Sequence, residues 1–345
     1  MEVTRENSMN IYRHLIDNPP RGPEAPYKPL RKGLYSVDGK SVVSLVRTDD
    51  RRKGINEAFR LIGGSPLLFK DVKGNIVIKP NLNTDDPFPR NTHPDTIRFI
   101  SESLINAGFP AGQIIVGESS GRARGLPTRH TMENMGIKAI ADDLGIQLSC
   151  FEEEEYVTVR PPKSRWWPDG IKIPRKVYEA ERVVIAPVMD LHRGPVSFTL
   201  GLKIGVGLLD SIGREWLHNG PDYPEPDFLE KAMEINLAYS ADLVVMDGMM
   251  FRRERSTSPT AIAKPGIIIV SNDRVSADAV AATVMKHYKT EKMIGKPILE
   301  YPTLQMSKAN GIGTPTMKEM ILKTSNLTAD NDFEDIIQEV HNELN

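Results

Sequence analysis

The sequence of 345 residues is poor in cysteine, with Cys150 as the single example, and aromatic residues make up only 6% of it. One cysteine excludes an intrachain disulfide and any zinc or iron–sulfur site built from cysteines alone. No segment approaches the roughly 20 consecutive apolar residues of a membrane span, and the first residues, MEVTRENSMNIYRHL, lack the apolar core of a signal peptide. We therefore expect a cytoplasmic protein that does not bind a membrane.

The sequence also lacks an excess of charge of one sign. It has 44 basic and 46 acidic residues, for a formal net charge of −2, so no overall field favours nucleic acid. It has neither the Gly-Lys-Ser/Thr of a P-loop nor a GxGxxG fingerprint, which disfavours a nucleotide cofactor. We predict no organic cofactor.

Short aliphatic runs typical of buried strands alternate with segments of helical periodicity. This alternation predicts an α/β fold with a mostly parallel, doubly wound sheet and helices on both faces. A β-hairpin is expected as an excursion over about 152–178, with Asp169-Gly170 as its tight turn. The predicted strands cover residues 41–46, 76–78, 114–116, 147–151, 183–186, 243–246 and 267–270.

The chain divides into three regions by composition. Residues 1–35 are polar and rich in proline, which predicts an extended N-terminal arm without chemistry. Residues 36–290 hold the strand–helix alternation and form the α/β domain. Residues 291–345 are expected to be a C-terminal helical extension.

The stretch 182–213 combines a buried strand with a cluster of reactive side chains. The aliphatic run 183–186 ends at Pro187, which cannot donate to a strand ladder. Asp190, His192 and Arg193 follow, and Lys203 lies in the glycine-rich TLGLKIGVG. These residues indicate either a site or a loop of solvated charges.

Other predicted strands also end in polar residues, and this favours a site. In α/β sheets, ligands bind outside the carboxyl ends of the strands. We therefore expect several of these ends to share one pocket, in which Lys79, His192, Lys203 and Asp247 meet. The polar ends of the strands are Lys79 and Asn81, Glu118 and Ser119, Asp190 and His192, Asp247, and Asn272 and Asp273.

Six segments, taken in order, resemble the family called domain of unknown function 362. They are IVIKPNL, HPDTIRFISESLINAG, IIVGESSG, RVVIAPVMDLHRGPVSFTLGLKIGVGLL, LVVMDGM and GIIIVSNDRVSADAVAAT, and they span about residues 74–287. The family's Lys-Pro-Asn is matched by residues 79–81, its Gly-(Asp/Glu)-Ser-Ser-Gly by 117–121, and its histidine and Ser-Leu-Lys-like segment by His192 and 199–203. Its Val-Asp-Gly is matched by 246–248, and the start of its Asp-Ala helix by Asp273 and 278–279. The resemblance supports the fold and the place of the site more than a reaction.

The sequence departs from the family's pattern in two places. Many relatives carry a ferredoxin-like cysteine cluster, and its absence here argues against electron transfer through such clusters. The loop after Asp247 is usually glycine-rich, but here it is FRRERSTSPTAIAKPG, which suggests a more anionic ligand.

Three functions compete. The first is an enzyme that acts on a small anionic metabolite, a carboxylate or phosphate, by acid–base chemistry of a class that the sequence leaves open. His192, oriented by Asp190 or Glu118, would move the proton, and cations would bind and polarise the anion. Its catalytic residues would be His192, Lys79, Lys203 and Asp190, and its binding residues Asn81, Glu118, Ser119, Ser120, Arg193, Asp247 and Arg252.

The second function is a metal-dependent enzyme that holds a divalent metal with Asp190 and His192 together with Glu118 or Asp247. The third is a non-catalytic protein that binds a small molecule. All three have a small molecule as partner, and the sequence is compatible with a homo-oligomer.

Overall fold

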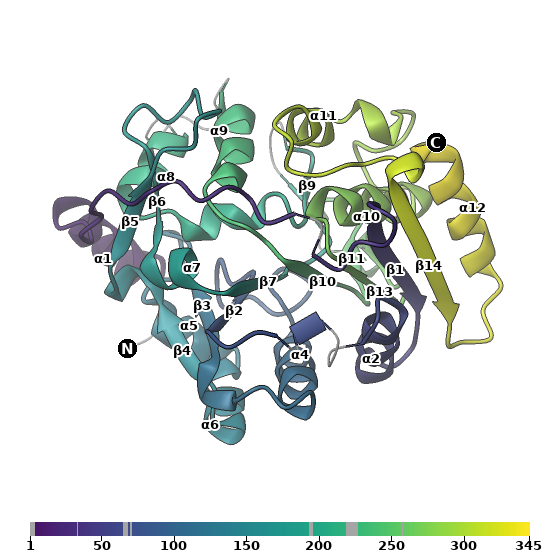
Figure 1. The fold of residues 1–345 in the computed structure, drawn as a ribbon, viewed down its shortest axis with the longest axis horizontal. Helices are drawn as coiled ribbons and strands as arrows, with labels where there is room; N and C mark the ends of the chain where they lie inside the picture. Colours follow the sequence, from purple (N-terminus) through teal and green to yellow (C-terminus); the bar gives the residue numbers. More distant parts are fainter. Residues whose placement is uncertain are drawn as a thin grey trace.

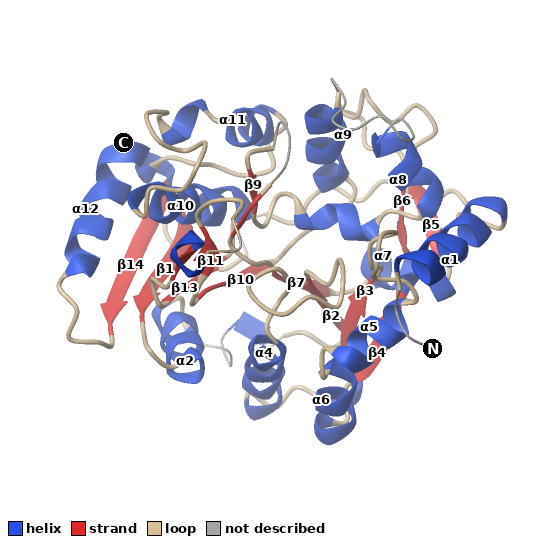
Figure 2. Cartoon of the chain, turned by 180° about the vertical axis from the view of Figure 1, so that it is seen from behind, coloured by secondary structure: helices blue, strands red, loops and turns tan. Residues whose placement is uncertain are grey.

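An eight-stranded β-sheet forms the centre of the computed structural model, which describes residues 4–32, 34–64, 68–69, 71–192, 196–218, 227–256 and 258–345 (Figures 1 and 2). The strands coincide with the aliphatic runs of the sequence, because β-branched side chains pack well on a pleated surface. Their order across the sheet is β14 (Met320–Asn326), β1 (Ser41–Arg47), β13 (Ile267–Ser271), β10 (Leu243–Gly248), β7 (Arg182–Ala186), β2 (Ile76–Pro80), β3 (Ile114–Glu118) and β4 (Gln147–Cys150).

The sheet is mostly parallel, as predicted, with β13 as the exception. This strand runs antiparallel to β1 and to β10, whereas the other neighbouring pairs are parallel. The prediction that Asn272 and Asp273 lie at the same edge as the other polar ends is therefore wrong. They follow the carboxyl end of β13, which points to the opposite edge. Asp273 caps helix α10 there, accepting from the backbone N–H groups of Val275 and Ser276.

Helices cover both faces of the sheet, as expected (Figures 1 and 2). Successive strand residues point to opposite faces, so each aliphatic strand contributes to two cores. The core on one face includes α2 (Arg51–Leu61), α4 (Pro94–Asn106), α5 (Thr128–Asn134) and α6 (Ile137–Leu144). The core on the other face includes α7 (Arg175–Glu179), α8 (Ser211–His218), α9 (Phe228–Glu234), α10 (Arg274–His287), α11 (Pro302–Ala309) and α12 (Asp332–Leu344).

Three two-stranded sheets accompany the main one. The predicted hairpin excursion is present as β5 (Tyr156–Val159) and β6 (Ile171–Pro174). The others are β8 (Asp190–Leu191) with β9 (Phe198–Thr199), and β11 (Phe251–Arg252) with β12 (Ile262–Ala263).

Both ends of the chain differ from the expectation. Within the expected extended arm, residues Arg5–Asp17 form helix α1, which is capped by the Thr4 side chain and packs against α8. The arm then follows β5, where Thr158 bonds to the backbone of Pro23 and Ala25. The C-terminal region is not only helical, because β14 joins the sheet as its edge strand.

The order of the strands reverses direction between β2 and β7. From β2 the chain adds β3 and β4 on one side, and it then returns to place β7, β10 and β13 on the other side. Connections that leave such a switch point on opposite faces open a crevice at the carboxyl ends of the two strands. The segments after Lys79 and after Ala186 therefore border the crevice in which an α/β protein binds its ligand.

Candidate functional site

A buried ion pair lies at the carboxyl ends of β2 and β3. The ammonium of Lys79 is 2.6 Å from Glu118 Oε2 and also donates to the carbonyl of Pro80 at 2.6 Å. The two residues are only 1% and 2% exposed. Burial lowers the pKa of Lys79, and the charge of Glu118 opposes that shift. Glu118 also accepts from the backbone N–H groups of Leu82 and Ser119, so it joins the ends of β2 and β3.

The turn that carries Lys203 crosses over this ion pair. The turn is a 3-10 helix, η3 (Ile204–Leu208), and Gly207 lies against both charged groups. It is anchored from the helix side, because the carboxylate of Asp278 accepts from the backbone N–H groups of Gly201 at 2.7 Å and of Leu202 at 2.8 Å. Burial of Asp278 raises its pKa to about 7. The glycine-rich sequence thus allows a close approach of backbone to the buried pair.

A substitution at Gly207 tests this close approach. A Cβ on residue 207 would lie 2.3 Å from Glu118 Oε1 and 2.7 Å from Lys79 Nζ, so Gly207→Ala must displace the pair. We expect a loss of about 2 kcal/mol in the free energy of unfolding, measured in urea. Gly112→Ala is the control, because its Cβ would meet nothing within 4 Å. Equal stabilities of the two variants would contradict the close packing.

Lys203 is partly buried and lies near several cations. Its ammonium makes no hydrogen bond and no ion pair with any residue that the structure describes. Burial lowers the pKa of Lys203 to about 8; Arg214 and Lys79 lower it further, and Asp190 opposes them. An amine with this pKa exchanges its proton close to neutral pH.

Helix α8 supplies two groups that we did not include among the predicted site residues. Arg214 is 8% exposed and donates to the backbone carbonyls of Ser119 and Ser120. No carboxylate in the described ranges forms an ion pair with it. His218 lies one helical turn further on, and burial lowers its pKa to about 4. The i, i+4 spacing of these two residues is the sequence signal that places them on one side of a helix.

His192 lies beside the same cluster. Its ring stacks on Phe228 with a centroid distance of 6.0 Å, and the ring of His218 contacts the same phenylalanine at 5.2 Å. Burial, followed by the charges of Lys203 and His218, lowers the pKa of His192 to about 2. The imidazole is therefore neutral at physiological pH.

The two carboxylates expected to orient His192 have other partners. Asp190 is held by Arg252 through two hydrogen bonds, from Nε at 2.8 Å and from Nη2 at 2.5 Å. Burial raises the pKa of Asp190, and this ion pair opposes the shift. Glu118 is bound to Lys79. The structure therefore places Arg252 opposite Asp190 and not as a free cation for a ligand.

The remaining predicted binding residues serve the surrounding loops. The Asn81 side chain donates to the carbonyl of Arg90, at the far end of the loop that follows β2. Ser119 and Ser120 present backbone carbonyls to Arg214, and the Ser120 N–H donates to Thr128 Oγ1. Arg193 lies outside the described residues.

Asp247 points away from this cluster. The polar end of β10 lies at the predicted edge, but its carboxylate projects to the face covered by α2 and α4. There it bonds to Arg51 Nε at 2.7 Å and to Thr96 Oγ1 at 2.5 Å. Lys79, with the opposite strand parity, projects to the other face. Of the four groups expected to meet, the structure brings together Lys79, His192 and Lys203, and it separates Asp247 from them.

A cavity of about 700 Å³ lies near Arg51, Phe88 and His93 on the side of Asp247. Its main charged groups are already neutralised, because Arg51 pairs with Asp247 and Arg47 with Asp330. Paired charges have little left to offer an ionic ligand. The cluster at the switch point has unpaired cations, which makes it the stronger candidate.

The residues proposed for a divalent metal do not form a ligand set. Glu118, Asp190 and Asp247 each bond to a different cation. Among the residues with described positions, no group of three or more His, Cys, Asp or Glu side chains could hold a metal ion. The positive charge of Lys203 and Arg214 also opposes a cation there.

A family model named "Domain of unknown function (DUF362)" matches residues 76–283. The chain belongs to the DUF362 family. No curated protein matches it. The DUF362 region contains all the residues that gather at the switch point, namely Lys79, Glu118, His192, Lys203 and Arg214, which we call the switch-point site.

The described part of this DUF362 protein was also searched for membrane-spanning helices. None of its helices has both the length and the apolar composition that a span requires.

Proposed function

We propose that the protein is an enzyme that acts on a small anionic metabolite, carrying a carboxylate or a phosphate, by acid–base chemistry at the switch-point site. One observation carries the proposal. Lys203 and Arg214 lie close enough for Arg214 to lower the pKa of Lys203, and neither forms an ion pair with a carboxylate of the described residues. Two such charges repel each other and have lost part of their hydration. An anion between them would relieve both costs.

Lys203 is the better candidate for proton transfer. Its pKa of about 8 lets both protonation states exist near neutral pH, which is the condition for a general acid or base. His192, with its pKa lowered to about 2, has no proton to give at neutral pH in the free protein. We assign His192 to hydrogen bonding with the ligand and Lys79 to electrostatic support.

A ligand screen tests the binding half of the proposal. Thermal shifts would be compared between anions and their uncharged counterparts of the same size, for example succinate and succinamide, with inorganic phosphate as a further probe. We expect at least one anion to raise the melting temperature while its uncharged counterpart does not, since bound ligand stabilises the folded state. Equal effects of charged and uncharged compounds throughout the screen would refute an anion site.

Anion binding should be coupled to proton uptake. A bound negative charge favours the charged form of Lys203 and so raises its pKa above the value of about 8 in the free protein. Near pH 8 the free lysine is about half protonated, so binding takes up about half a proton per site. At pH 6 it is already protonated, and no uptake is expected from it.

Calorimetry measures this uptake directly. In two buffers of different ionisation enthalpy, the observed binding enthalpy should differ at pH 8 and agree at pH 6. A buffer-independent enthalpy at both values would contradict the assigned role of Lys203.

Turnover separates an enzyme from a binding protein. Each carboxylate found in the screen would be incubated with the protein in D₂O, and proton NMR would follow exchange at the carbon next to the carboxylate. Exchange or product formation supports acid–base catalysis. Anions that bind without either would leave a non-catalytic binding protein, the alternative inferred from the sequence.

A further inference from the structure

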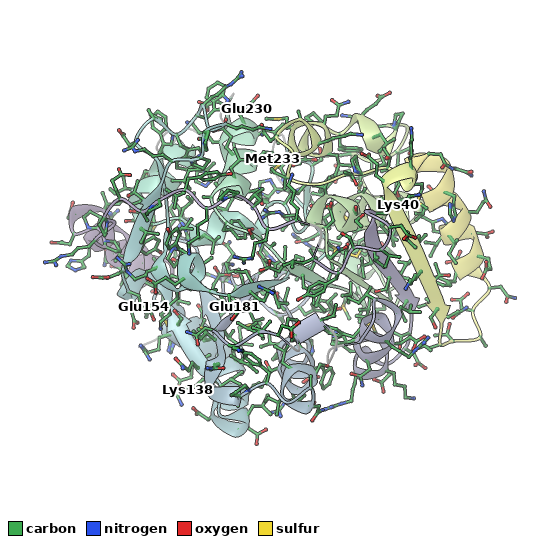
Figure 3. All side chains as sticks on the ribbon, in the orientation of Figure 1. Lys40, Lys138, Glu154, Glu181, Glu230 and Met233 are labelled. Atoms are coloured by element: carbon green, nitrogen blue, oxygen red, sulfur yellow. The ribbon has the colours of Figure 1, made fainter. Side chains whose placement is uncertain are left out.

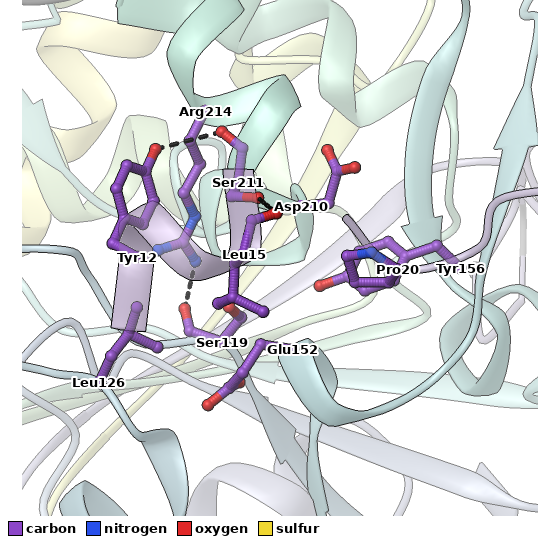
Figure 4. A pocket seen from close by; sticks show the side chains of 10 residues that line it. All are labelled: Tyr12, Leu15, Pro20, Ser119, Leu126, Glu152, Tyr156, Asp210, Ser211 and Arg214. Carbon is purple, nitrogen blue, oxygen red and sulfur yellow. Dashed lines mark hydrogen bonds between the residues drawn. The ribbon is translucent and has the colours of Figure 1, made fainter. Parts of the chain in front are cut away.

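A small cavity lies behind Arg214, on the side away from Lys79 and Glu118 (Figure 4). Helix α1 covers it, since the Tyr12 hydroxyl donates to the Ser211 carbonyl at 3.1 Å and the Ser211 hydroxyl donates to the Leu15 carbonyl at 2.8 Å. Its volume is about 10 Å³. This is about the space that one water molecule occupies.

Three polar atoms on the walls of this cavity lack hydrogen-bond partners in the described structure. They are Glu152 Oε2, the Tyr156 hydroxyl and Arg214 Nε, and all three are closed off from solvent. Each residue otherwise has fixed surroundings. Glu152 Oε1 accepts from the backbone N–H of Thr128 at 2.7 Å, and the two terminal nitrogens of Arg214 donate to backbone carbonyls.

Three unsatisfied groups around one cavity are unusual. A buried polar group without a partner is destabilising, and most such groups in proteins are satisfied by protein or by ordered water. Arg214 Nε can only donate, Glu152 Oε2 can accept, and the Tyr156 hydroxyl can do either. One water molecule has two donor and two acceptor positions, so it can serve all three at once.

We propose that one ordered water occupies this cavity and joins Glu152, Tyr156 and Arg214 into a network that holds the Arg214 guanidinium against the carbonyls of Ser119 and Ser120. Glu152 and Tyr156 are then positioning residues for Arg214. The water site does not depend on an anion being bound, so it can stand or fall separately from the proposed function.

A high-resolution crystal structure tests the occupant. We expect a single density peak about 2.7–3.2 Å from each of the three atoms. Bromide-soaked crystals distinguish water from a halide, because bromide at this position would give anomalous signal. An empty cavity or a bromide peak would overturn the proposal.

Two substitutions test the network in solution. If water bridges the tyrosine, Tyr156→Phe removes a hydrogen bond and should lower the melting temperature by about 2 °C. If the hydroxyl has no partner, removing it should leave the melting temperature unchanged or raise it, which would overturn the proposal. Tyr27→Phe is the control, since the Tyr27 hydroxyl makes no hydrogen bond in the described structure.

The Nε–H signal of Arg214 in proton–nitrogen NMR spectra supplies a readout that general destabilisation does not change. In the wild-type protein this proton should exchange slowly with solvent, because it is buried and bonded. In Tyr156→Phe and Glu152→Gln its chemical shift and exchange rate should change, and in Tyr27→Phe they should not. Fast exchange in the wild type would show that Arg214 Nε is not held by this network.

Discussion

Replacing Lys203 with methionine should make the protein more stable and unable to bind its anion. Burial and nearby cations lower the pKa of Lys203 to about 8 from its ordinary value of 10.5, so the charged form is less stable in the folded than in the unfolded protein. We expect Lys203→Met to gain about 2 kcal/mol in the free energy of unfolding at pH 7. Loss of a charge-assisted contact should weaken anion binding about 10- to 100-fold.

The stability gain should depend on pH in one direction. Below pH 8 the lysine is charged in both states, so the wild type carries the full cost. Between pH 8 and 10.5 the folded protein loses the proton first, the cost declines, and the two proteins should approach the same stability. Denaturation in urea at pH 7, 9 and 10 measures this. Lys138→Met is the control, on an exposed lysine of α6 at the far edge of the molecule (Figure 3). A destabilised Lys203→Met would mean that the lysine has a structural role.

Glu118→Ala should cause the largest loss of stability. It removes the only carboxylate bonded to Lys79 and leaves that ammonium buried without a counter-charge. Breaking a buried ion pair in this way typically costs about 3–5 kcal/mol. Since folded proteins are stable by only about 5–15 kcal/mol, the variant should be close to unfolding at 37 °C.

Two comparisons identify the cause of that loss. Removing both charges in Lys79→Met/Glu118→Leu should cost less than Glu118→Ala, because no buried charge is left unpaired. The exposed pair of Lys138 and Asp142, with a similar separation of 2.5 Å, provides the surface control. Asp142→Ala should change stability by no more than about 0.5 kcal/mol. If Glu118→Ala were as stable as Asp142→Ala, the buried pair would not be a source of stability.

The fold was predictable from the sequence to a large extent. The aliphatic runs marked the strands because burial on both faces of a parallel sheet requires apolar residues at successive positions, and that requirement is local. Lys79 and Lys203 were identified because a cation beside such a run is costly unless it has a purpose. The direction of β13 was not predictable, since an antiparallel strand with two covered faces has the same aliphatic pattern as a parallel one.

The candidate site was predictable in position but not in its pairings. Asp190 was expected to orient His192, two residues away, but it bonds to Arg252, 62 residues further along the chain. Helix α8 was predicted as a loop because prolines and glycines follow it, so Arg214 and His218 were not included among the site residues. Asp247 was placed at the right edge of the sheet, but the face it projects to depends on the register of β10 within the sheet.

By itself, the sequence determined the α/β class, the approximate places of the strands and the set of ionisable residues near their ends, because these follow from local periodicity and burial. The tertiary structure alone decided which charges are paired. The neighbour of a buried ion depends on which strands and helices meet, and this left Lys203 and Arg214 without a carboxylate while Lys79, Asp190 and Asp247 each acquired a partner of opposite charge.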